Sequence, residues 1–523
     1  MIVTRQDQTV VETEHALLIA CGRFAEQVGL LAALEQVPFK MKTIDRSPEE
    51  KTAELLAHIL AGGMHVNELA KSAHPLVKDQ AVAEAWGQKT FASVSGVSDL
   101  LRSVSQDTVE ALTAQLRQVL APHRRRILRD LSPSFLVVDL DLTGLVVSDQ
   151  ATTYEGADFG YMGELDGVGR GYQFARAQLV GQTDAFVLGG FLHPGRTVET
   201  HCLRELVALI ETEVGRPRRR VELVESRLID LEQKLAEVET ALTRREAGGA
   251  FLRRRVRRLE RERERLQTQL ECLRTRRDEL TAENDANPNP RRIILRLDGG
   301  FGDAAKLAWL YEQGYDFVVR AHNHRVSERL RCEVGLSWQK VSKNGFMAES
   351  QQTSLGDCPY PMRLFLCKQW WGDKRPERWS ALIVTPTLKS AQWPTRRVGV
   401  FYDGRQVIEA GIKEGKGIFA SRHLPTRHHA GIAFYEELVL LAQNLVRWFR
   451  RQFLGNTVLA AASVKELVRI GANSRAQVLH RGEALSLTFA VDSPWHGITL
   501  SLKTQFSYQL WLPMLDDLVS IRT

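Results

Sequence analysis

The sequence predicts an α/β core built on a mixed β-sheet, joined to a helical N-terminal domain, a helical hairpin and a β-rich insertion. Residues 135–147 form an apolar run typical of a buried strand, and residues 291–322 have the pattern strand, turn, helix, strand. Between residues 228 and 280, apolar residues recur three and four apart, which is the spacing of a coiled coil. A chain of 523 residues exceeds one ordinary core, so we expect two or three domains with insertions.

The N-terminal residues 1–130 are predicted to be mostly helical, because their apolar residues recur at helical spacing. Arg124, Arg125 and Arg126 close this region. Two interpretations stay open, a helical docking domain with a solvated arginine run or, as the family resemblance described below implies, a domain that binds DNA. No helix-turn-helix pattern identifies base-reading residues.

Residues 216–287 predict an antiparallel coiled-coil hairpin, with its turn at Gly248-Gly249 and its end before Pro288. At 1.5 Å per residue, each helix would be about 45 Å long. The start of the second helix is strongly cationic, and the arginines predicted to contact DNA there are Arg253, Arg254, Arg257 and Arg258. Two alternatives stay open: the hairpin contacts a second copy of the chain, or it presents a solvated coiled-coil face with Glu–Arg pairs inside each helix.

Acidic residues interrupt or end the predicted core strands. Asp139 and Asp141 lie within the first apolar run, and Asp298 falls where the strand that begins near residue 291 ends. Strand ends of an α/β sheet are where ligand sites form, although a single Asp there is often only a cap or turn residue. Together with Glu409 on a separate element, Asp141 and Asp298 would supply hard oxygen ligands for Mg²⁺.

Tyr402, Arg405, Glu409 and Lys416 form a tetrad with the spacing Y-x2-R-x3-E-x6-K. On one continuous helix these four positions would share a wedge of about 60°. A carboxylate flanked by cations suits a site that holds a metal ion and a nucleic-acid phosphate. The alternative is an ordinary Arg405–Glu409 pair on a solvated helix.

These motifs resemble the cut-and-paste DDE transposases of bacterial insertion sequences, in the branch defined by a Y-R-E-K helix. In that branch the first catalytic Asp is followed by x-Thr, as Asp141 is and Asp139 is not. The second lies in a strand-terminal Asp-x-Gly-Phe, which residues 298–301 match, and the third is the Glu of the tetrad. The resemblance extends to the helical N-terminal residues and to residues 467–489, and it leaves out the charged stretch around 216–285.

The resemblance implies an RNase H-like core, in which Asp141 and Asp298 lie on adjacent strands with Glu409 beside them. The expected elements are strands near 135–147, 172–181 and 184–192, a helix over 199–215, strand 293–298, helix 303–313, strand 316–321 and the Glu409 helix.

The insertion at 325–400 alternates apolar and polar residues between Gly, Pro and Asp, which predicts β-hairpins. In the resembling family, a β insertion at this point carries an aromatic residue that stacks on a flipped base. Trp338, Trp370 and Trp371 stand beside basic residues and are the candidates, since stacking is worth about 1–3 kcal/mol. A tryptophan in a strand is also common in a core, and the sequence does not choose among the three.

Beyond the tetrad, the sequence predicts a long amphipathic helix with a basic end and then a β-rich tail. Packing against the tetrad helix, DNA contact and dimerisation would each explain them. The expected division is a helical domain at 1–130, core parts at 131–215 and 288–324, the hairpin at 216–287, the β-rich insertion at 325–400, the catalytic and following helices at 401–455, and the C-terminal region at 456–523.

Global properties agree with this resemblance, which implies a DNA-associated protein inside a bacterial cell. The net charge of +7 and the pI near 9.1 favour a polyanionic partner. The six cysteines form no CxxC pair, so we expect reduced thiols in a cytoplasm. Without a signal-like segment or a run of eighteen apolar residues, we expect no membrane insertion, and nucleoid association when DNA is bound.

The sequence therefore predicts a transposase that excises and integrates an insertion sequence. Asp141, Asp298 and Glu409 would hold two Mg²⁺ ions, replaceable by Mn²⁺, about 3.5–4 Å apart at the scissile phosphate. The other three tetrad residues would hold DNA phosphates. The expected partners are double-stranded DNA, as terminal inverted repeats and target, and a second copy in a homodimer. The alternatives are an RNase H-like nuclease, a non-enzymatic coiled-coil DNA-binding protein and a domesticated, inactive relative.

Overall fold

The computed structural model describes residues 9–503 apart from 42–44, 132–133, 247–252, 373–375 and 482–483. The chain divides into two compact units. The first contains Met1–His123, Thr153–Glu155 and Lys413–Thr523, and the second contains Arg124–Thr152 and Gly156–Ile412. Each unit is described by itself. The finer division into seven segments stays a prediction.

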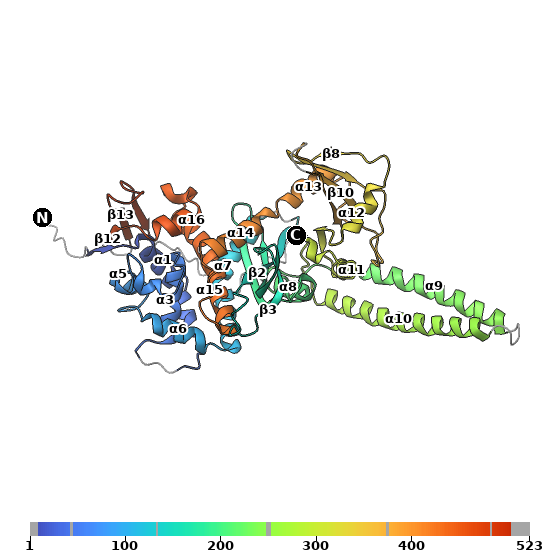
Figure 1. The fold of residues 1–523 in the computed structure, drawn as a ribbon, viewed down its shortest axis with the longest axis horizontal. Coiled ribbons are helices and arrows are strands. Elements are labelled where there is room, and N and C mark those ends of the chain that lie inside the picture. The colour runs from blue at the N-terminus through green and yellow to red at the C-terminus, as the bar shows by residue number, and fades with distance from the viewer. Residues whose placement is uncertain are drawn as a thin grey trace, which may run out of the picture. The chain divides into compact units, whose positions relative to one another are not determined.

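The second unit contains a ten-stranded mixed sheet in its described residues (Figure 1), with the strand order β3-β4-β2-β6-β7-β11-β10-β9-β8 and β5 paired to β4. Its central strands β2, β6 and β7 are parallel, and the other pairs are antiparallel. The strands are β2 Leu136–Val146, β3 Asp158–Met162, β4 Gly167–Leu179, β5 Phe186–Pro194, β6 Ile293–Leu297, β7 Asp316–Arg320, β8 Gln339–Lys340, β9 Gly345–Glu349, β10 Arg363–Gln369 and β11 Arg378–Val384. The prediction of an α/β core with a mixed sheet is confirmed.

Burial explains why the central strands are apolar throughout. All five residues of β6 are buried, as are the first four of β7, because parallel strands are covered on both faces. Helices α8 (Glu199–Val214) and α11 (Ala304–Glu312) lie in the crossovers of this sheet. Two of the buried polar residues inside it, Asp139 of β2 and Arg296 of β6, pair with each other.

The β-rich insertion continues the core sheet. Strand β11 pairs antiparallel with β7 through Leu382, Ile383 and Val384, and β10, β9 and β8 follow outward. The hairpins expected over 325–400 are therefore added strands of one sheet. The same segment also contains two helices, α12 (His324–Arg331) and the start of α13 (Thr395–Asp403).

Helices α9 (Val221–Glu246) and α10 (Arg253–Asp285) run side by side as a long hairpin (Figure 1). Their 26 and 33 residues correspond to about 39 and 50 Å at 1.5 Å per residue. Buried leucines and a valine at heptad spacing form the seam: Val224, Leu228, Leu242, Leu266, Leu270, Leu273 and Leu280. The predicted turn at Gly248-Gly249 lies outside the described residues. We name α9 and α10 together the arm.

Buried ion pairs fasten the base of the arm to the core of its unit. Arg219, 3 % exposed at its side chain, pairs with Glu211 at 2.8 Å and Glu283 at 2.6 Å. Arg220 pairs with Asp316 at 2.7 Å and donates to the carbonyls of Tyr311 and Tyr315. Since breaking a buried ion pair is costly, the base of the arm is a rigid part of this unit.

The first unit is built from helices around a small antiparallel sheet. The helices are α1 Ala16–Gln27, α2 Leu30–Leu34, α3 Pro48–Leu60, α4 Glu68–Lys71, α5 Gln80–Ala85, α6 Val94–Ser103, the N-terminal part of α7 (Gln106–Asp130), α15 His429–Phe453 and α16 Val464–Glu466. The sheet has the order β1-β12-β13-β14, with β1 Thr9–Thr13, β12 Ala476–Arg481, β13 Ala484–Phe489 and β14 Thr499–Lys503.

Helix α15 is the central helix of this unit. Of the residues expected at its basic end, Arg447 is buried and pairs with Glu414 at 2.8 Å. Strand β1 was not predicted, because the N-terminal segment was expected to be helical. It pairs with β12 from Thr9↔His480 to Thr13↔Ala476.

All six cysteines lie in the described part and are free thiols. Within the described ranges, no helix combines the length and the apolar character needed to cross a lipid bilayer.

Candidate functional site

Two polar rows meet on neighbouring strands of the second unit. Strands β2 and β6 are parallel, and their register pairs Asp139 with Arg296. Side chains two residues apart in a strand share a face, so Asp141 and Asp298 form the next pair along the same two rows. Asp298 itself follows β6 and caps the short helical turn η3 (Gly299–Phe301).

The Asp139–Arg296 pair is buried and has no free carboxylate oxygen for a ligand. Asp139 is fully buried, and Arg296 donates to both of its oxygens at 2.5 and 2.7 Å. Burial raises the pKa of Asp139, and the hydrogen bonds from Arg296 oppose that shift. With both oxygens engaged, Asp139 is a structural residue, and Asp141 is the acid of β2 that remains available.

The guanidinium of Arg405 brings three carboxylates together. Its Nη2 lies 2.9 Å from Asp141 Oδ1 and 3.9 Å from Asp298 Oδ2, and its Nη1 donates to Glu409 Oε1 at 3.0 Å. The side chains of Asp298 and Glu409 are each 45 % exposed, whereas those of Asp141 and Arg405 are 15 % and 8 % exposed. We call Asp141, Asp298, Glu409 and Arg405 the acidic cluster.

The electrostatics of the acidic cluster follow from its burial. Loss of hydration raises the pKa of Asp141 to about 6, Arg405 opposes this, and the charges of Asp298 and Glu409 add to it. Burial also works against the charge of Arg405, but the facing carboxylates outweigh it and its pKa is raised. The cluster is therefore a set of mutually repelling carboxylates held together by one buried cation.

The prediction that one helix carries the whole tetrad is wrong. Tyr402 lies in α13, which ends at Asp403, and Glu409 and Lys416 lie in α14 (Gln406–Gly417), with Arg405 immediately before it. The break falls at Gly404, where an added Cβ would lie 2.2 Å from Nη1 of Arg296. The buried Asp139–Arg296 pair thus occupies the space that a side chain at residue 404 would need.

Tyr402 contacts the backbone beside the acidic cluster. Its hydroxyl donates to the carbonyl oxygen of Leu297 at 3.3 Å, one residue before Asp298. Burial raises the pKa of the Tyr402 hydroxyl, so it stays a neutral donor at physiological pH. In this arrangement Tyr402 supports the end of β6, and contact with a DNA phosphate would require that hydrogen bond to break.

Lys416 lies in the last turn of α14 and is buried. The helix crosses the boundary between the units, since residues to Ile412 belong to the second and residues from Lys413 to the first. Lys416 is therefore placed with the first unit. Its predicted part in holding DNA stays a prediction.

The chemistry of the acidic cluster fits a hard divalent cation, because carboxylate oxygens on separate elements are the ligands that Mg²⁺ prefers. The side chains that would hold the ion are Asp141, Asp298 and Glu409. The guanidinium of Arg405 takes the cationic position between them, and among the described residues no group of three or more His, Cys, Asp or Glu is arranged to hold a metal. Metal binding stays a prediction that requires Arg405 to yield its contacts.

The three candidate tryptophans lie at the outer strands of the sheet. Trp338 is 40 % exposed and makes an edge contact with Trp379, at 5.9 Å between ring centres. Trp370 is 48 % exposed, and with Trp371 it lines a pocket of about 310 Å³ that also contains Lys340 and Lys343. The Trp370–Trp371 pocket combines aromatic and cationic side chains, the combination that single-stranded bases prefer.

The cationic start of α10 is solvent-facing where its side chains are described. Arg257 and Arg258 are exposed, and among the described residues no carboxylate forms an ion pair with either. Arg253 and Arg254 belong to α10, but their side chains lie outside the described part. The arginines that pair within the arm, such as Arg274 with Glu232, lie nearer its base.

Sequence reasoning missed two features near the acidic cluster. It placed Arg405 among phosphate contacts, whereas the structure buries it among carboxylates. It also passed over Glu199, the first residue of α8, whose carboxyl group reaches within 2.4 Å of where a Cβ on Gly300 would lie. The Gly299-Gly300 pair after Asp298 was the signal for this, because only a glycine admits such an approach.

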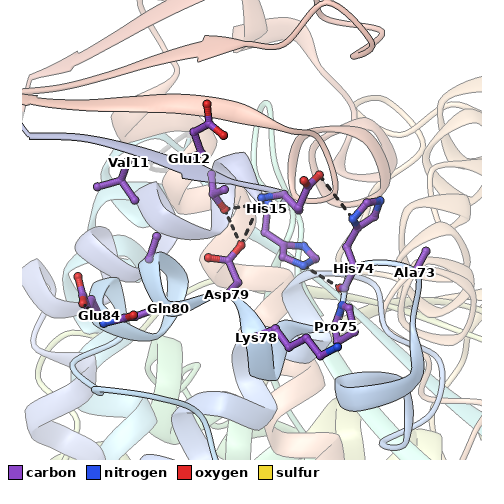
Figure 2. A pocket seen from close by; sticks show the side chains of 13 residues that line it. Val11, Glu12, His15, Ala73, His74, Pro75, Lys78, Asp79, Gln80 and Glu84 are labelled. Atoms are coloured by element: carbon purple, nitrogen blue, oxygen red, sulfur yellow. Dashed lines mark hydrogen bonds and ion pairs between the residues drawn. The ribbon is translucent and has the colours of Figure 1, made fainter.

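A separate pocket of about 580 Å³ lies within the first unit, between β1 and the start of α5 (Figure 2). In this pocket Asp79 accepts from Thr13 at 2.8 Å, and His74 lies 3.5 Å from Glu14. His15 contacts the carbonyls of Ala472 and His74. These groups are used in joining β1 to the helices, which makes the acidic cluster the better candidate for chemistry.

No protein-family model matches the chain, and no curated protein matches it in a sequence search.

Proposed function

We propose that this protein is a DNA transposase of the DDE type, which cuts DNA at the ends of an insertion sequence and joins those ends to a target. The observation that carries the proposal is the convergence of Asp141, Asp298 and Glu409 on Arg405. These are the three acids that the resemblance to the Y-R-E-K branch selects. The neighbouring acid Asp139, which that resemblance rejects, is engaged by Arg296.

The proposed core is RNase H-like. Its support is the order β5-β4-β2-β6-β7 within the larger sheet, with β2, β6 and β7 parallel and β4 antiparallel to β2. Along the chain, β2, β4 and β5 precede α8, and β6, α11, β7 and α14 follow. This is the succession of strands and helices expected for that fold, with β3 as an added strand and the arm inserted before β6.

In the proposed mechanism, Asp141, Asp298 and Glu409 are the residues that would hold divalent metal at the scissile phosphate. When bound, Mg²⁺ would activate a water molecule and stabilise the leaving oxygen. The Asp139–Arg296 pair keeps β2 and β6 in register, and Tyr402 holds the carbonyl just before Asp298. These contacts fix two of the three acids relative to each other, because both lie on the paired strands or at their ends.

Arg405 has a specific part in this proposal. It offsets part of the negative charge of the three acids, and it would be free to contact a phosphate of the DNA end where metal takes its place beside them. A guanidinium suits both tasks, since it forms paired hydrogen bonds with carboxylates and with phosphates alike. Lys416, Arg257 and Arg258 are proposed as further phosphate contacts, which position DNA without reading its sequence.

The proposed partners are double-stranded DNA and a second copy of the chain. Joining two element ends to one target requires two active sites, so we propose a homodimer on DNA. The exposed arginines of the arm would contact the end that the other copy holds. The Trp370–Trp371 pocket is the preferred candidate for stacking on an unpaired base, because Lys340 and Lys343 lie beside it.

The test is cleavage of a plasmid that carries the element with its native flanking DNA, in Mg²⁺ and separately in Mn²⁺. Wild-type protein should release 3′-hydroxyl ends at the element boundary and join them to target DNA. Asp298→Asn should abolish both products, whereas Asp357→Asn, an exposed acid of the same unit, should leave them unchanged. Cutting without any joined product would favour a nuclease, and DNA binding with no metal-dependent cutting would favour an inactive relative.

A further inference from the structure

A second polar pocket lies in the first unit, at the N-terminus of α6. It has a volume of about 500 Å³, and its lining includes Arg46, Lys51, Ser93, Ser95 and Gly96. This pocket is separate from the acidic cluster, and no residue of the proposed catalytic site contributes to it. We call it the α6 pocket.

The N-terminus of α6 provides donors and a partial positive charge. Ser93 caps the helix through its Oγ, which accepts from the Gly96 amide at 3.3 Å and lies 2.9 Å from Ser95 Oγ. The first amides of a helix have no partner within the helix, and its dipole favours an anion at this end. Ser93 and Ser95 are exposed, so this first turn faces solvent.

Lys51 supplies an independent observation that points to an anion. It is only 7 % exposed, and among the described residues its side-chain ammonium group has no hydrogen-bond acceptor and no carboxylate within ion-pair distance. Its Cε lies 3.5 Å from the position of a Cβ on Gly96, which places the end of Lys51 over the first turn of α6. A lysine is rarely buried to this degree without a partner.

The nearest buried acid does not supply that partner. Glu54, on the same helix as Lys51, accepts from the Ala92 amide at 2.6 Å. Burial raises the pKa of the Glu54 carboxyl to about 8, with Arg46 and Lys51 opposing, so it is largely protonated at neutral pH. Arg46 adds a second cation and donates to Thr90 Oγ1.

Two acids also line the α6 pocket. Asp99 is exposed and pairs with Arg102 at 2.5 Å, and Asp45 is exposed. The charge of Asp45 opposes an anion in the pocket, whereas that of Asp99 is offset by Arg102. Lys51 and Arg46 line the same pocket together with the first turn of α6.

We propose that the α6 pocket binds one phosphate group of the DNA backbone, held by Lys51, Arg46 and the first turn of α6. A backbone phosphate fits better than a small metabolite, because the serines of the turn are exposed and the protein carries a net charge of +7. This assignment rests on the proposed function for the identity of the nucleic acid. The pocket's affinity for phosphate does not depend on the acidic cluster.

The experiment compares Lys51→Met with Lys71→Met in the full-length protein. Lys71 is an exposed lysine of the same unit and does not line the α6 pocket, so it controls for the loss of one charge. Affinity for a duplex of about 20 base pairs is measured at several salt concentrations. Loss of one phosphate contact lowers the slope of log K against log salt by about 0.9. Lys51→Met should show that drop with binding about tenfold weaker, and Lys71→Met should differ less in both.

The second experiment measures binding of inorganic phosphate by ³¹P NMR line broadening. Phosphate that broadens with wild-type protein and not with Lys51→Met, together with the changed DNA slope, supports the proposal. Phosphate binding that depends on Lys51 with an unchanged DNA slope would overturn the assignment to DNA in favour of free phosphate. If Lys51→Met and wild type give the same DNA salt slope and the same phosphate line broadening, the proposed site is wrong.

Thermal unfolding establishes that each variant is folded. If Lys51→Met does not fold, Arg46→Gln takes its place with the same expected changes and the same contrary outcomes. Neither of these two experiments measures DNA cleavage. A failed α6 pocket would therefore leave the transposase proposal standing, and a protein that binds phosphate here without cutting DNA would leave the pocket standing.

Discussion

At the scale of single residues, Arg405 determines the state of the acidic cluster. Three carboxylates close together repel one another, and a fixed guanidinium at 2.9 to 3.9 Å offsets that repulsion. The same cation competes with metal for the same oxygens. The cluster is thereby kept assembled without metal, and Arg405 must yield its contacts before the three acids can act as ligands.

A neighbouring residue, Gly404, is constrained by the buried Asp139–Arg296 pair. Replacing it by alanine places a Cβ 2.2 Å from Arg296, whose far end is already fixed by both oxygens of Asp139. Gly404→Ala should therefore lower the free energy of unfolding by about 1–3 kcal/mol, measured by urea denaturation. Gly417→Ala is the control, because an added Cβ there meets no atom of the described residues within 4 Å. Equal stability of the two variants would contradict this packing.

Burial of Glu54 predicts how stability depends on pH. Its pKa in the folded protein is raised from 4.5 to about 8, mainly by burial. Its contribution to stability is therefore fully present below pH 4.5 and is lost as the pH rises through about 8. Glu54→Gln, which cannot ionise, should lose less stability than wild type between about pH 5 and about pH 9. Urea unfolding across that range measures this, and parallel curves for the two proteins would exclude the raised pKa.

At the scale of elements, the arm is a rigid extension of the second unit. Its base contributes Arg219 and Arg220 to buried ion pairs with Glu211 and Asp316. Removing the whole hairpin together with Arg219 and Arg220 would leave Glu211 without this ion pair and Asp316 with Arg292 as its partner. A cut beyond the base avoids this penalty, since Glu232 and Arg274 already face each other across the arm.

Truncation of the arm therefore tests its function separately from folding. Replacing residues 238–268 with a short glycine-rich turn should leave the midpoint of thermal unfolding nearly unchanged, because the seam near the base is kept. DNA binding should weaken, with the salt slope falling by about 0.9 for each lost phosphate contact. Paired-end complexes on native gels should disappear. Normal pairing of two ends by this variant would show that the arm is a passive insertion.

The elements of the core could be predicted from local patterns. Apolar runs over 135–147 and 293–298 correspond to β2 and β6, since strands covered on both faces are apolar throughout. Heptad spacing likewise predicted α9 and α10. Strand β1 could not be predicted, because its partner β12 lies more than four hundred residues away and nothing local requires the pairing.

The acidic cluster could be predicted only in part. Spacing selected Asp141, Asp298 and Glu409, but helical geometry applied to the tetrad assumed one unbroken helix. The break falls at Asp403-Gly404, a dipeptide typical of turns, whereas the clash that a side chain at 404 would meet comes from Arg296, which is remote in sequence. Burial of Arg405 among the acids also depends on tertiary packing and needed the structure.

At the scale of the whole molecule, the protein combines a mixed α/β core that carries the acidic cluster, an N-terminal unit and a cationic arm. A nuclease of the same core would need the acidic cluster alone. A DNA-binding protein without activity would need only the cationic surfaces. The proposed transposase uses both, so cutting and binding must be separable by a change in the acidic cluster.

Glu409→Gln tests this most directly, with Glu35→Gln, an exposed glutamate of the first unit, as the control. End-labelled DNA that contains the element boundary is used for binding and for Mg²⁺-dependent cleavage in the same preparation. Glu409→Gln should bind this DNA as tightly as wild type does. It should cut the DNA at least about a thousandfold more slowly, because one of the three proposed metal ligands is lost. Cleavage by Glu409→Gln at a rate close to that of wild type would contradict the central claim.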